Sequence, residues 1–175
     1  IDNCATCISA DECTSCKNPL YLKDGKCVSD CEAHYVPIDG VCKTCSQPSC
    51  VKCSASDTAQ CYECSDGYFL NNEHQCVTDC GDGFYPKNGK CISCGDDKCS
   101  VCAEQNHCTK CAPGSVLYKG KCLPLCVPGT YEEEDECLPC TDQDRCNTCY
   151  PLNPSHCKEC QIGYLSDGLC VDLYL

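Results

Sequence analysis

The stretch Cys94–Cys140 reads CGDDKCSVCAEQNHCTKCAPGSVLYKGKCLPLCVPGTYEEEDECLPC, and the rest of the chain repeats it. Its cysteines stand at 94, 99, 102, 108, 111, 122, 126, 137 and 140, and the same rhythm runs from 45 to 94. Aligned on the first cysteine of each cycle (4, 50, 99 and 146), the periods are 46, 49 and 47 residues. The chain is therefore predicted to be a serial array of one unit. We place the repeats at 1–45, 46–94, 95–140 and 141–175, the last one partial.

Cysteine dominates the composition, with 29 residues among 175. Leu, Ile, Val and Phe together number only 28, and the net charge is −13. A chain with so little apolar surface and so much charge is normally disordered, because burial cannot offset its conformational entropy. Disulfides are the expected substitute for a hydrophobic core, since each stabilises a fold by about 2–4 kcal/mol. We expect a small disulfide-rich fold with essentially no helix.

The cysteine content also indicates the compartment. Disulfides persist in oxidising environments, so we expect an extracellular or cell-surface location. No run of 18 apolar residues is present, so the sequence predicts no membrane span within this chain. Ile1 begins directly in cysteine-rich sequence, which predicts a mature or excised ectodomain. The acidic charge disfavours nucleic acid and anionic lipid as partners.

Each repeat alternates two kinds of segment. The dense kind, such as CSQPSCVKC at 45–53, has so few residues between cysteines that we expect neither a helix nor a strand pair there. The longer kind has a turn dipeptide near its centre, such as Asp24-Gly25 or Asn88-Gly89. These dipeptides accept the positive φ angles of tight hairpins, so each longer segment is predicted to be a two-stranded ribbon clamped by a disulfide. Ribbons that bury little alone should stack in series into an elongated rod.

A tyrosine often stands just before the turn of a ribbon. We expect these rings to pack on the disulfides of the next ribbon rather than to bind a ligand. The six positions are Tyr21, Tyr35, Tyr68, Tyr85, Tyr131 and Tyr164.

Eleven CxxC pairs leave three interpretations of the cysteines open. Zinc could be held by four thiolates, as in CKTCSQPSCVKC at 42–53, although ribbon-type sites usually separate their pairs by about 15–20 residues. Redox catalysis of the thioredoxin type needs a CxxC at a helix N-terminus on a βαβ framework, and no such framework is visible. Structural disulfides need neither feature, and we favour this interpretation.

The order CxxC–CxxC–GY/L–turn–CxxxC–turn–CxxC resembles the furin-like cysteine-rich repeat. Such repeats occur in growth-factor-receptor ectodomains, R-spondins and furin-type proprotein convertases. The chain also resembles the cysteine-rich CxxC surface antigens of protozoa, notably the Giardia variant-specific surface proteins. The resemblance covers nearly the whole chain and implies tandem repeats of short β-ribbons. It says less about function, because such repeats serve many roles.

The resemblance implies a disulfide pairing in which two modules alternate, and in which no CxxC closes on itself. The implied crossed pairs are Cys45–Cys53 with Cys50–Cys61, Cys94–Cys102 with Cys99–Cys108, and Cys140–Cys149 with Cys146–Cys157. The implied single loops are Cys16–Cys27, Cys31–Cys42, Cys64–Cys76, Cys80–Cys91, Cys111–Cys122, Cys126–Cys137 and Cys160–Cys170. The implied first pair is Cys4–Cys13.

Cys7 is left over in this scheme, so we expect it to be unpaired in this chain. The equivalent cysteines of later repeats pair eight or nine positions upstream, which for Cys7 falls before Ile1. We therefore expect its partner in a longer parent chain. At the other end a cysteine is due at position 174, where Tyr174 stands.

Other candidate chemistry is sparse. The histidines lie in different segments without a neighbouring Ser and Asp, and we expect them to be solvent-exposed. They are His34, His74, His107 and His156. The acidic run Glu132–Glu136 could bind calcium or a basic partner, but its carboxylates are consecutive rather than alternating, so we interpret it as a solvated loop. No phosphate loop, paired catalytic carboxylates or activated nucleophile is evident, and we expect no enzyme, cofactor or metal.

The sequence leaves three functions in competition. We favour a non-enzymatic cell-surface ectodomain, a protease-resistant protozoan surface antigen that meets a host antibody and whose short crosslinked loops resist local unfolding. The alternative is a cysteine-rich binding module of a receptor or secreted ligand, with a protein partner. A zinc-binding CxxC protein is the second alternative. Exposed tyrosines gathered on one face would favour the binding module, and tyrosines buried on disulfides would favour the antigen.

Overall fold

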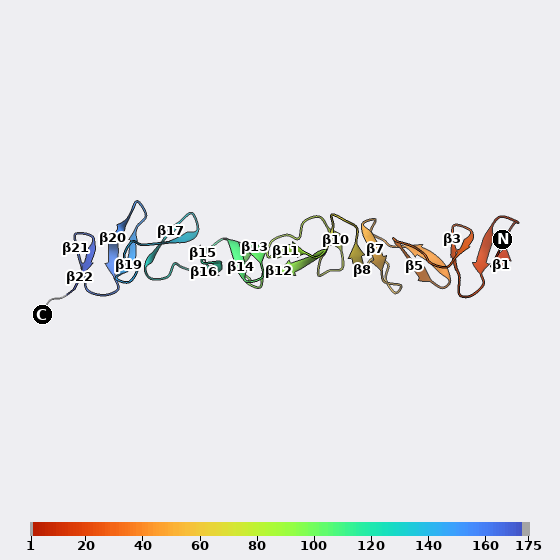
Figure 1. Ribbon diagram of the computed structural model, residues 1–175, viewed down its shortest axis with the longest axis horizontal. Coiled ribbons are helices and arrows are strands. Elements are labelled where there is room, and N and C mark those ends of the chain that lie inside the picture. The colour runs from red at the N-terminus through yellow and green to blue at the C-terminus, as the bar shows by residue number, and fades with distance from the viewer. Residues whose placement is uncertain (1, 173–175) are drawn as a thin grey trace. The chain divides into compact units, whose positions relative to one another are not determined.

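The computed structural model describes residues 2–172, which form 22 short β-strands and no helix (Figure 1). None of these elements is a helix that could cross a membrane. The chain divides into two compact units, Ile1–Cys80 with Pro86–Ile92 and Gly81–Tyr85 with Ser93–Leu175, and each is described by itself. Tyr174, where the repeat pattern predicts a cysteine, lies outside the described residues. The four sequence repeats remain a proposed division of the chain.

The dense cysteine segments form strand pairs, so the expectation that they would not is wrong. In unit 1, Cys50 lies opposite Cys64 and Cys53 lies opposite Cys61 in an antiparallel pair. Short segments still need partners for their backbone amides and carbonyls, and a neighbouring CxxC strand supplies them. The pairs are β1 (Cys4–Cys7) with β2 (Cys13–Cys16), β7 (Cys50–Cys53) with β8 (Cys61–Cys64), β13 (Cys99–Glu104) with β14 (His107–Cys111), and β19 (Cys146–Tyr150) with β20 (Asn153–Cys160).

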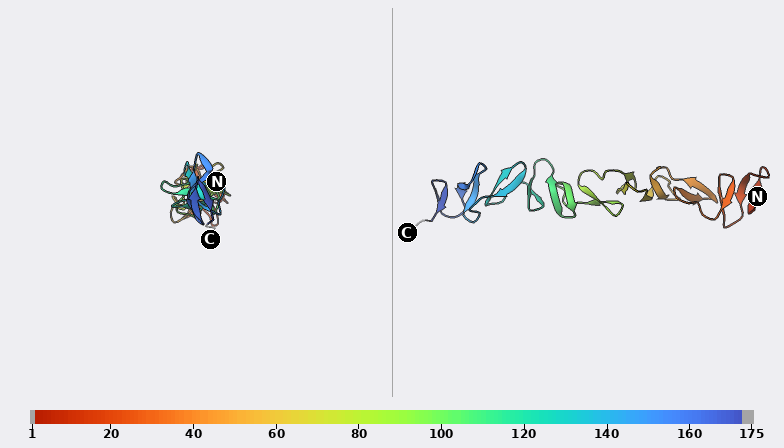
Figure 2. Two further views of the ribbon diagram at one scale, coloured as in Figure 1. Left: turned by 90° about the vertical axis from the view of Figure 1, so that its left-hand side faces the viewer. Right: turned by 45° about the horizontal axis from the view of Figure 1, so that its top comes forward.

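The longer segments form the predicted two-stranded ribbons, whose strands lie side by side in the further views of Figure 2. Their turn residues have positive φ, 48° at Asp24 and 73° at Gly25, as tight hairpins require. The ribbons are β3 (Tyr21–Lys23) with β4 (Lys26–Val28), β5 (Tyr35–Ile38) with β6 (Val41–Thr44), β9 (Phe69–Leu70) with β10 (Cys76–Val77), β15 (Val116–Tyr118) with β16 (Lys121–Leu123), β17 (Thr130–Glu133) with β18 (Glu136–Pro139), and β21 (Tyr164–Ser166) with β22 (Leu169–Val171). The segment at the boundary of the units supplies β11 (Phe84–Lys87) and β12 (Lys90–Ser93).

Successive ribbons are joined by a parallel strand contact. In unit 1 the amide of Leu22 on β3 donates to the carbonyl of Gly40, 2.8 Å away, and β3 lies beside β6. In unit 2 the amide of Leu117 on β15 donates to the carbonyl of Asp135, 2.7 Å away, and β15 lies beside β18. Two ribbons thereby become one four-stranded sheet, in the orders β4-β3-β6-β5 and β16-β15-β18-β17.

Cysteine supplies most of the core. Among the described residues 22 apolar side chains are buried, and 18 of them are cysteines. The seven side chains that are less than 2% exposed are all cysteines. The other buried apolar residues are Val36, Tyr85, Val116 and Tyr131. A fold with this core depends on its crosslinks, because very little hydrocarbon is removed from water.

Of the six tyrosines, two are buried, two (Tyr21 and Tyr35) are half-buried and two are exposed. Tyr131 is 8% exposed and packs in a cluster with Cys140 and other cysteines, and Tyr85 is equally buried. Tyr68 is 38% exposed, so the expectation of packing on disulfides is wrong for this ring. Tyr164 on β21 is 49% exposed, but residues 2–172 contain no following ribbon, so for Tyr164 the expectation stays a prediction. Nothing in the structure explains the exposure of Tyr68.

Candidate functional site

Fourteen disulfides crosslink the described residues, and they join the same pairs that the resemblance implies. Each bond links residues between 8 and 12 positions apart. The crosslinks are therefore local and follow one another along the chain. This connectivity stays a prediction of ours, which mass mapping of non-reduced peptides tests.

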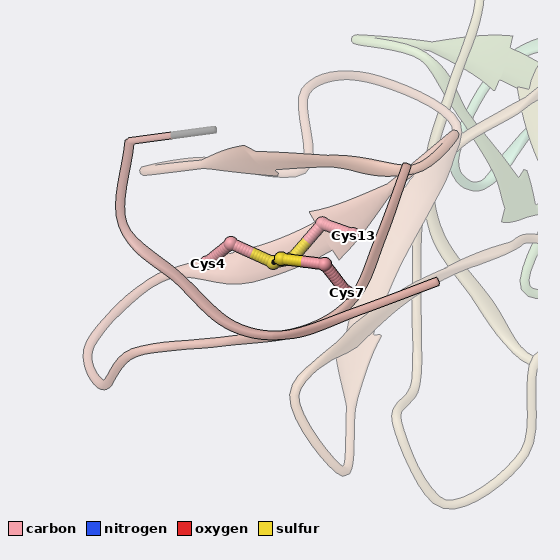
Figure 3. A group of neighbouring side chains, drawn as sticks. All are labelled: Cys4, Cys7 and Cys13. Carbon is pink, nitrogen blue, oxygen red and sulfur yellow. Dashed lines mark hydrogen bonds between the residues drawn. A yellow bond between two sulfur atoms is a disulfide. The ribbon is translucent and has the colours of Figure 1, made fainter. Parts of the chain in front are cut away.

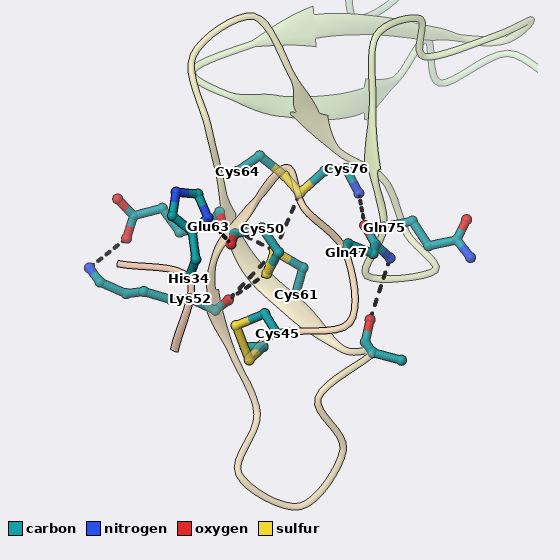
Figure 4. The surroundings of a disulfide bond; sticks show 12 residues. His34, Cys45, Gln47, Cys50, Lys52, Cys61, Glu63, Cys64, Gln75 and Cys76 are labelled. Carbon is teal, nitrogen blue, oxygen red and sulfur yellow. Dashed lines mark hydrogen bonds and ion pairs between the residues drawn. A yellow bond between two sulfur atoms is a disulfide. The ribbon is translucent and has the colours of Figure 1, made fainter. Parts of the chain in front are cut away.

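One crossed module shows how the crosslinks are packed (Figure 4). Cys50 and Cys61 are bonded and almost fully buried, with 1% and 0% of their surfaces exposed. The next disulfide, Cys64–Cys76, lies against this one, because the sulfurs of Cys76 and Cys61 are 3.3 Å apart. Neighbouring disulfides thus contact one another and form the interior that a hydrophobic cluster forms elsewhere.

Polar side chains fix the loops around these disulfides. The Gln47 side-chain oxygen accepts a hydrogen bond of 2.9 Å from the amide of Cys76, 29 residues later in the chain. His34 Nδ1 lies 2.7 Å from the carbonyl oxygen of Cys50. Within residues 2–172, no buried side-chain nitrogen or oxygen lacks a partner. The sequence analysis did not single out Gln47, since its role depends on a contact between distant positions.

Cys7 is the free cysteine of the described chain, and its side chain is exposed. Its sulfur points at the Cys4–Cys13 disulfide, 2.8 Å from the Cys4 sulfur (Figure 3). That Cys7 has no partner within this chain stays a prediction, which counting of free thiols tests.

The described chain contains five places where three cysteine sulfurs lie within 4.8 Å of one another. Every cysteine in these groups except Cys7 is already bonded in a disulfide. Zinc binds thiolates, so a metal at any of these places would require disulfides to be reduced first. The zinc interpretation therefore depends on the redox state of the protein rather than on geometry alone.

Two lysines have perturbed titration. A hydrogen bond to Glu32 raises the pKa of Lys23, whose ammonium also lies 4.1 Å from the centre of the Tyr35 ring. A hydrogen bond to Glu63 raises the pKa of Lys52. Both shifts favour the charged lysine, so these groups hold surface ion pairs and do not act as bases.

All four histidines are exposed, as the sequence analysis predicts, and each contacts different neighbours. His74 contacts the edge of the Tyr62 ring, with ring centres 5.8 Å apart. The ring of His107 lies against Gly120, and His156 Nδ1 lies 2.8 Å from the Asn153 side-chain nitrogen. None of them is brought together with a serine hydroxyl and a carboxylate in the described part of the chain, so the structure offers no triad there.

Comparison with known proteins identifies the repeat. Residues 73–138 match the family described as furin-like repeat, cysteine-rich. The fold is that of tandem furin-like cysteine-rich repeats. The 22 strands and 14 disulfides agree with this assignment over the described chain. The matched furin-like segment includes residues 94–138 of the stretch on which the sequence analysis was built.

The furin-like repeats are similar to segments of much larger proteins. Cysteine repeat modular protein 2 of Tetrahymena thermophila is 36% identical over 84 residues, which cover 42% of this chain and 4% of that protein. Proprotein convertase subtilisin/kexin type 5 of Mus musculus is 36% identical over 174 residues, covering 97% of this chain and 7% of that protein. R-spondin-2 of Mus musculus is 44% identical over 39 residues, which cover 22% of this chain and 16% of that protein. The chain spans only a small part of each relative.

The furin-like repeats also form grooves beside the CxxxC motifs. The Leu125 groove is lined by Leu125, Val127, Pro128, Glu132, Pro151 and Lys158, among others. The Asp30 groove occupies the equivalent place in unit 1 and is lined by Asp30, Glu32, Ala33, Tyr35, Val36 and Lys52, among others. The sequence analysis missed both. Aligning the residues on either side of the second cysteine of each CxxxC would have shown that the pairs differ in charge.

Proposed function

We propose that this chain is a non-enzymatic extracellular module whose task is to remain folded and uncut while displayed on a cell surface. The observation that carries the proposal is the core, in which 18 of 22 buried apolar side chains are cysteines. Because crosslinks of 8 to 12 residues follow one another along the chain, local opening is confined to a few residues at a time. A protease needs a flexible strand of several residues, which such a chain does not offer.

The finer part of the proposal is a surface antigen of a protozoan, with a host antibody as its partner. Its support is the CxxC repeat pattern and the similarity to a Tetrahymena protein described as a cysteine repeat modular protein. A display role also suits a surface of exposed charged loops with a net charge of −13. Antibodies raised against the folded chain should label intact cells of the source organism without permeabilisation. Labelling that requires permeabilisation would argue against surface display.

The protease assay uses the 13 lysines and arginines as reporters. The intact chain is incubated with trypsin and then denatured without reduction, and its intact mass is measured by mass spectrometry. Each internal cut adds one water to the mass even where disulfides hold the pieces together. We expect the oxidised chain to stay uncut under conditions that fully digest a reduced and alkylated sample. Rapid cutting at most lysines of the oxidised chain would refute the protective role.

A second candidate function is a binding module for a protein partner. Specific support comes from exposed apolar side chains in unit 2, where Leu125 and Leu152 are 74% and 100% exposed and Tyr150 is 51% exposed. Exposed clusters of this kind mark interaction sites on soluble proteins. The similarity to R-spondin-2 over 39 residues is compatible with this candidate but identifies no partner.

A further inference from the structure

The Leu125 groove and the Asp30 groove have the same place in the repeat, but different residues flank the second cysteine of their CxxxC motifs. Each has a volume of about 380 Å³. The residues on either side of Cys31 are Asp30 and Glu32. The residues on either side of Cys126 are Leu125 and Val127, so two carboxylates are replaced by two hydrocarbon side chains. The repeat fold tolerates both pairs, which means that packing does not dictate the apolar pair.

The Asp30 groove satisfies its polar groups internally. Lys23 bridges to Glu32 with a nitrogen–oxygen distance of 2.8 Å and also lies over the Tyr35 ring. In the ribbon of unit 2 the residue at the position of Lys23 is Tyr118, since β15 pairs with β18 as β3 pairs with β6. The Leu125 groove has no such ion pair among the described residues, and Leu125 itself is 74% exposed.

A second segment brings more apolar surface to the same groove. Pro151 lines the groove at the tip of the β19–β20 pair, and its neighbours Tyr150 and Leu152 are 51% and 100% exposed. The corresponding tips of the second and third repeats read SASDTA at 54–59 and AEQN at 103–106, without a large apolar residue, whereas the first pair has Ile8, which is 74% exposed. Exposed apolar residues on two separate segments thus lie at the Leu125 groove, and neither has a counterpart in the second repeat. Tyrosine and leucine exposed beside a groove are suited to receive an apolar side chain.

An acidic run, here called the acidic rim, begins at one edge of the Leu125 groove. Glu132 lines the groove and begins the run Glu132–Glu136, all of whose side chains are exposed. Glu133 lies directly opposite Glu136 across the β17–β18 pair, an arrangement of like charges that destabilises a ribbon. None of the ion pairs of the described chain involves this run. The cation that lines the groove, Lys158, lies 5.1 Å from the Tyr150 ring centre.

We propose that the Leu125 groove is a docking site for a basic polypeptide segment that inserts one bulky apolar side chain. The apolar side chain would lie on Leu125 and Pro151, and flanking lysines or arginines would lie along the acidic rim. A second copy of this chain does not suit the site, because a net charge of −13 makes two copies repel. An anionic membrane is repelled for the same reason. The proposal rests on the second candidate function and is independent of the protective role.

The test is selection of a random twelve-residue peptide library displayed on phage, using the oxidised chain of 175 residues as the target. We expect enriched peptides that combine a large apolar residue with flanking Lys or Arg. One enriched peptide is synthesised and titrated into the ¹⁵N-labelled chain. Amide shifts should concentrate at Leu125, Val127 and Thr148, and should be absent from the equivalent positions of the Asp30 groove.

Variants distinguish binding at this groove from non-specific binding to exposed apolar residues. The double change Leu125→Asp with Val127→Glu installs the charge of the Asp30 groove. It should weaken peptide binding roughly ten- to a hundredfold, which is the loss of affinity expected when the bound peptide no longer buries one leucine side chain. Ile162→Asp, at another exposed apolar residue of unit 2, should leave affinity within about twofold. Glu132→Gln with Glu133→Gln tests the acidic rim without touching the apolar lining, and it should weaken binding and flatten its salt dependence.

The outcomes are distinct. No enrichment, enriched peptides without basic residues, or equal affinity for the Leu125→Asp/Val127→Glu variant would overturn the proposal. If that variant lacks the dispersed amide spectrum of the folded chain, the glutamine pair decides instead, and its failure to weaken binding would equally overturn the proposal. Trypsin resistance of the same oxidised samples reports the protective role separately, so either function can fail alone.

Discussion

Gly129 is predicted to be a position where one methyl group destabilises its repeat. Its φ of +83° is strained for any residue with a Cβ, at about 1–2 kcal/mol. A Cβ there would lie 2.5 Å from the carbonyl oxygen of Gln143, so the Gln143 backbone must move at a further cost of about 1–3 kcal/mol. The expected loss for Gly129→Ala is therefore about 2–5 kcal/mol.

Gly83 supplies a matched control in the preceding repeat. Its φ is +80°, but a Cβ there would meet only the Cys99 carbonyl oxygen at an ordinary 3.7 Å. Gly83→Ala should therefore cost only the conformational term, about 1–2 kcal/mol. The stiffer unfolded chain affects both variants alike and cancels in the comparison. The equivalent residue of the first repeat is His34, with a φ of 70°, which shows that this position can hold a side chain.

Native-state hydrogen exchange measures the effect where it occurs. The amide of Cys140 donates to the Gly129 carbonyl at 2.8 Å, and the amide of Cys94 donates to the Gly83 carbonyl at 2.8 Å. A loss of at least about 2 kcal/mol should speed exchange at Cys140 by roughly 30-fold or more in Gly129→Ala. The acceleration at Cys94 in Gly83→Ala should be smaller, about 5- to 30-fold for a cost of about 1–2 kcal/mol. Equal acceleration in the two variants would refute the steric argument.

Three further predictions follow from the disulfides and the lysines. Alkylation of the denatured, non-reduced chain should modify one thiol, and Cys7→Ser should abolish that modification; more than one modified cysteine would contradict the proposed pairing. Reduction without denaturant should collapse the dispersion of amide resonances, because 28 residues of Leu, Ile, Val and Phe cannot hold 175 residues; a reduced chain with native dispersion would contradict the sulfur core. Lys52 should titrate above its ordinary value of 10.5 and return toward it in Glu63→Gln. Because the folded pKa is raised, the Lys52–Glu63 pair contributes its stability fully below that ordinary value and loses it as pH rises through the raised pKa, so a titration unchanged by Glu63→Gln would argue against the pair.

The ribbons and their order along the chain could be predicted because their causes are local. Asp24-Gly25 and similar dipeptides accept positive φ without help from distant residues, and the cysteine spacing recurs about every 47 residues. The replacement of a hydrophobic core by disulfides also follows from composition alone, since too few apolar residues exist to make one. The furin-like assignment came from the same spacing, and the match over 73–138 supports it.

The remaining features depend on contacts between segments, and only the tertiary structure decided them. Cys50 lies opposite Cys64 in the β7–β8 pair yet is bonded to Cys61, so cysteine spacing does not indicate strand register. The parallel contact of β3 with β6 needs an amide and a carbonyl from different ribbons, which no single segment encodes. The burial of Tyr131 depends on its packing in one cluster with Cys140 and Cys146, which lie in the segments that follow its ribbon. The Leu125 groove arises where two segments meet, so only the fold could show that Leu125 and Pro151 line the same groove.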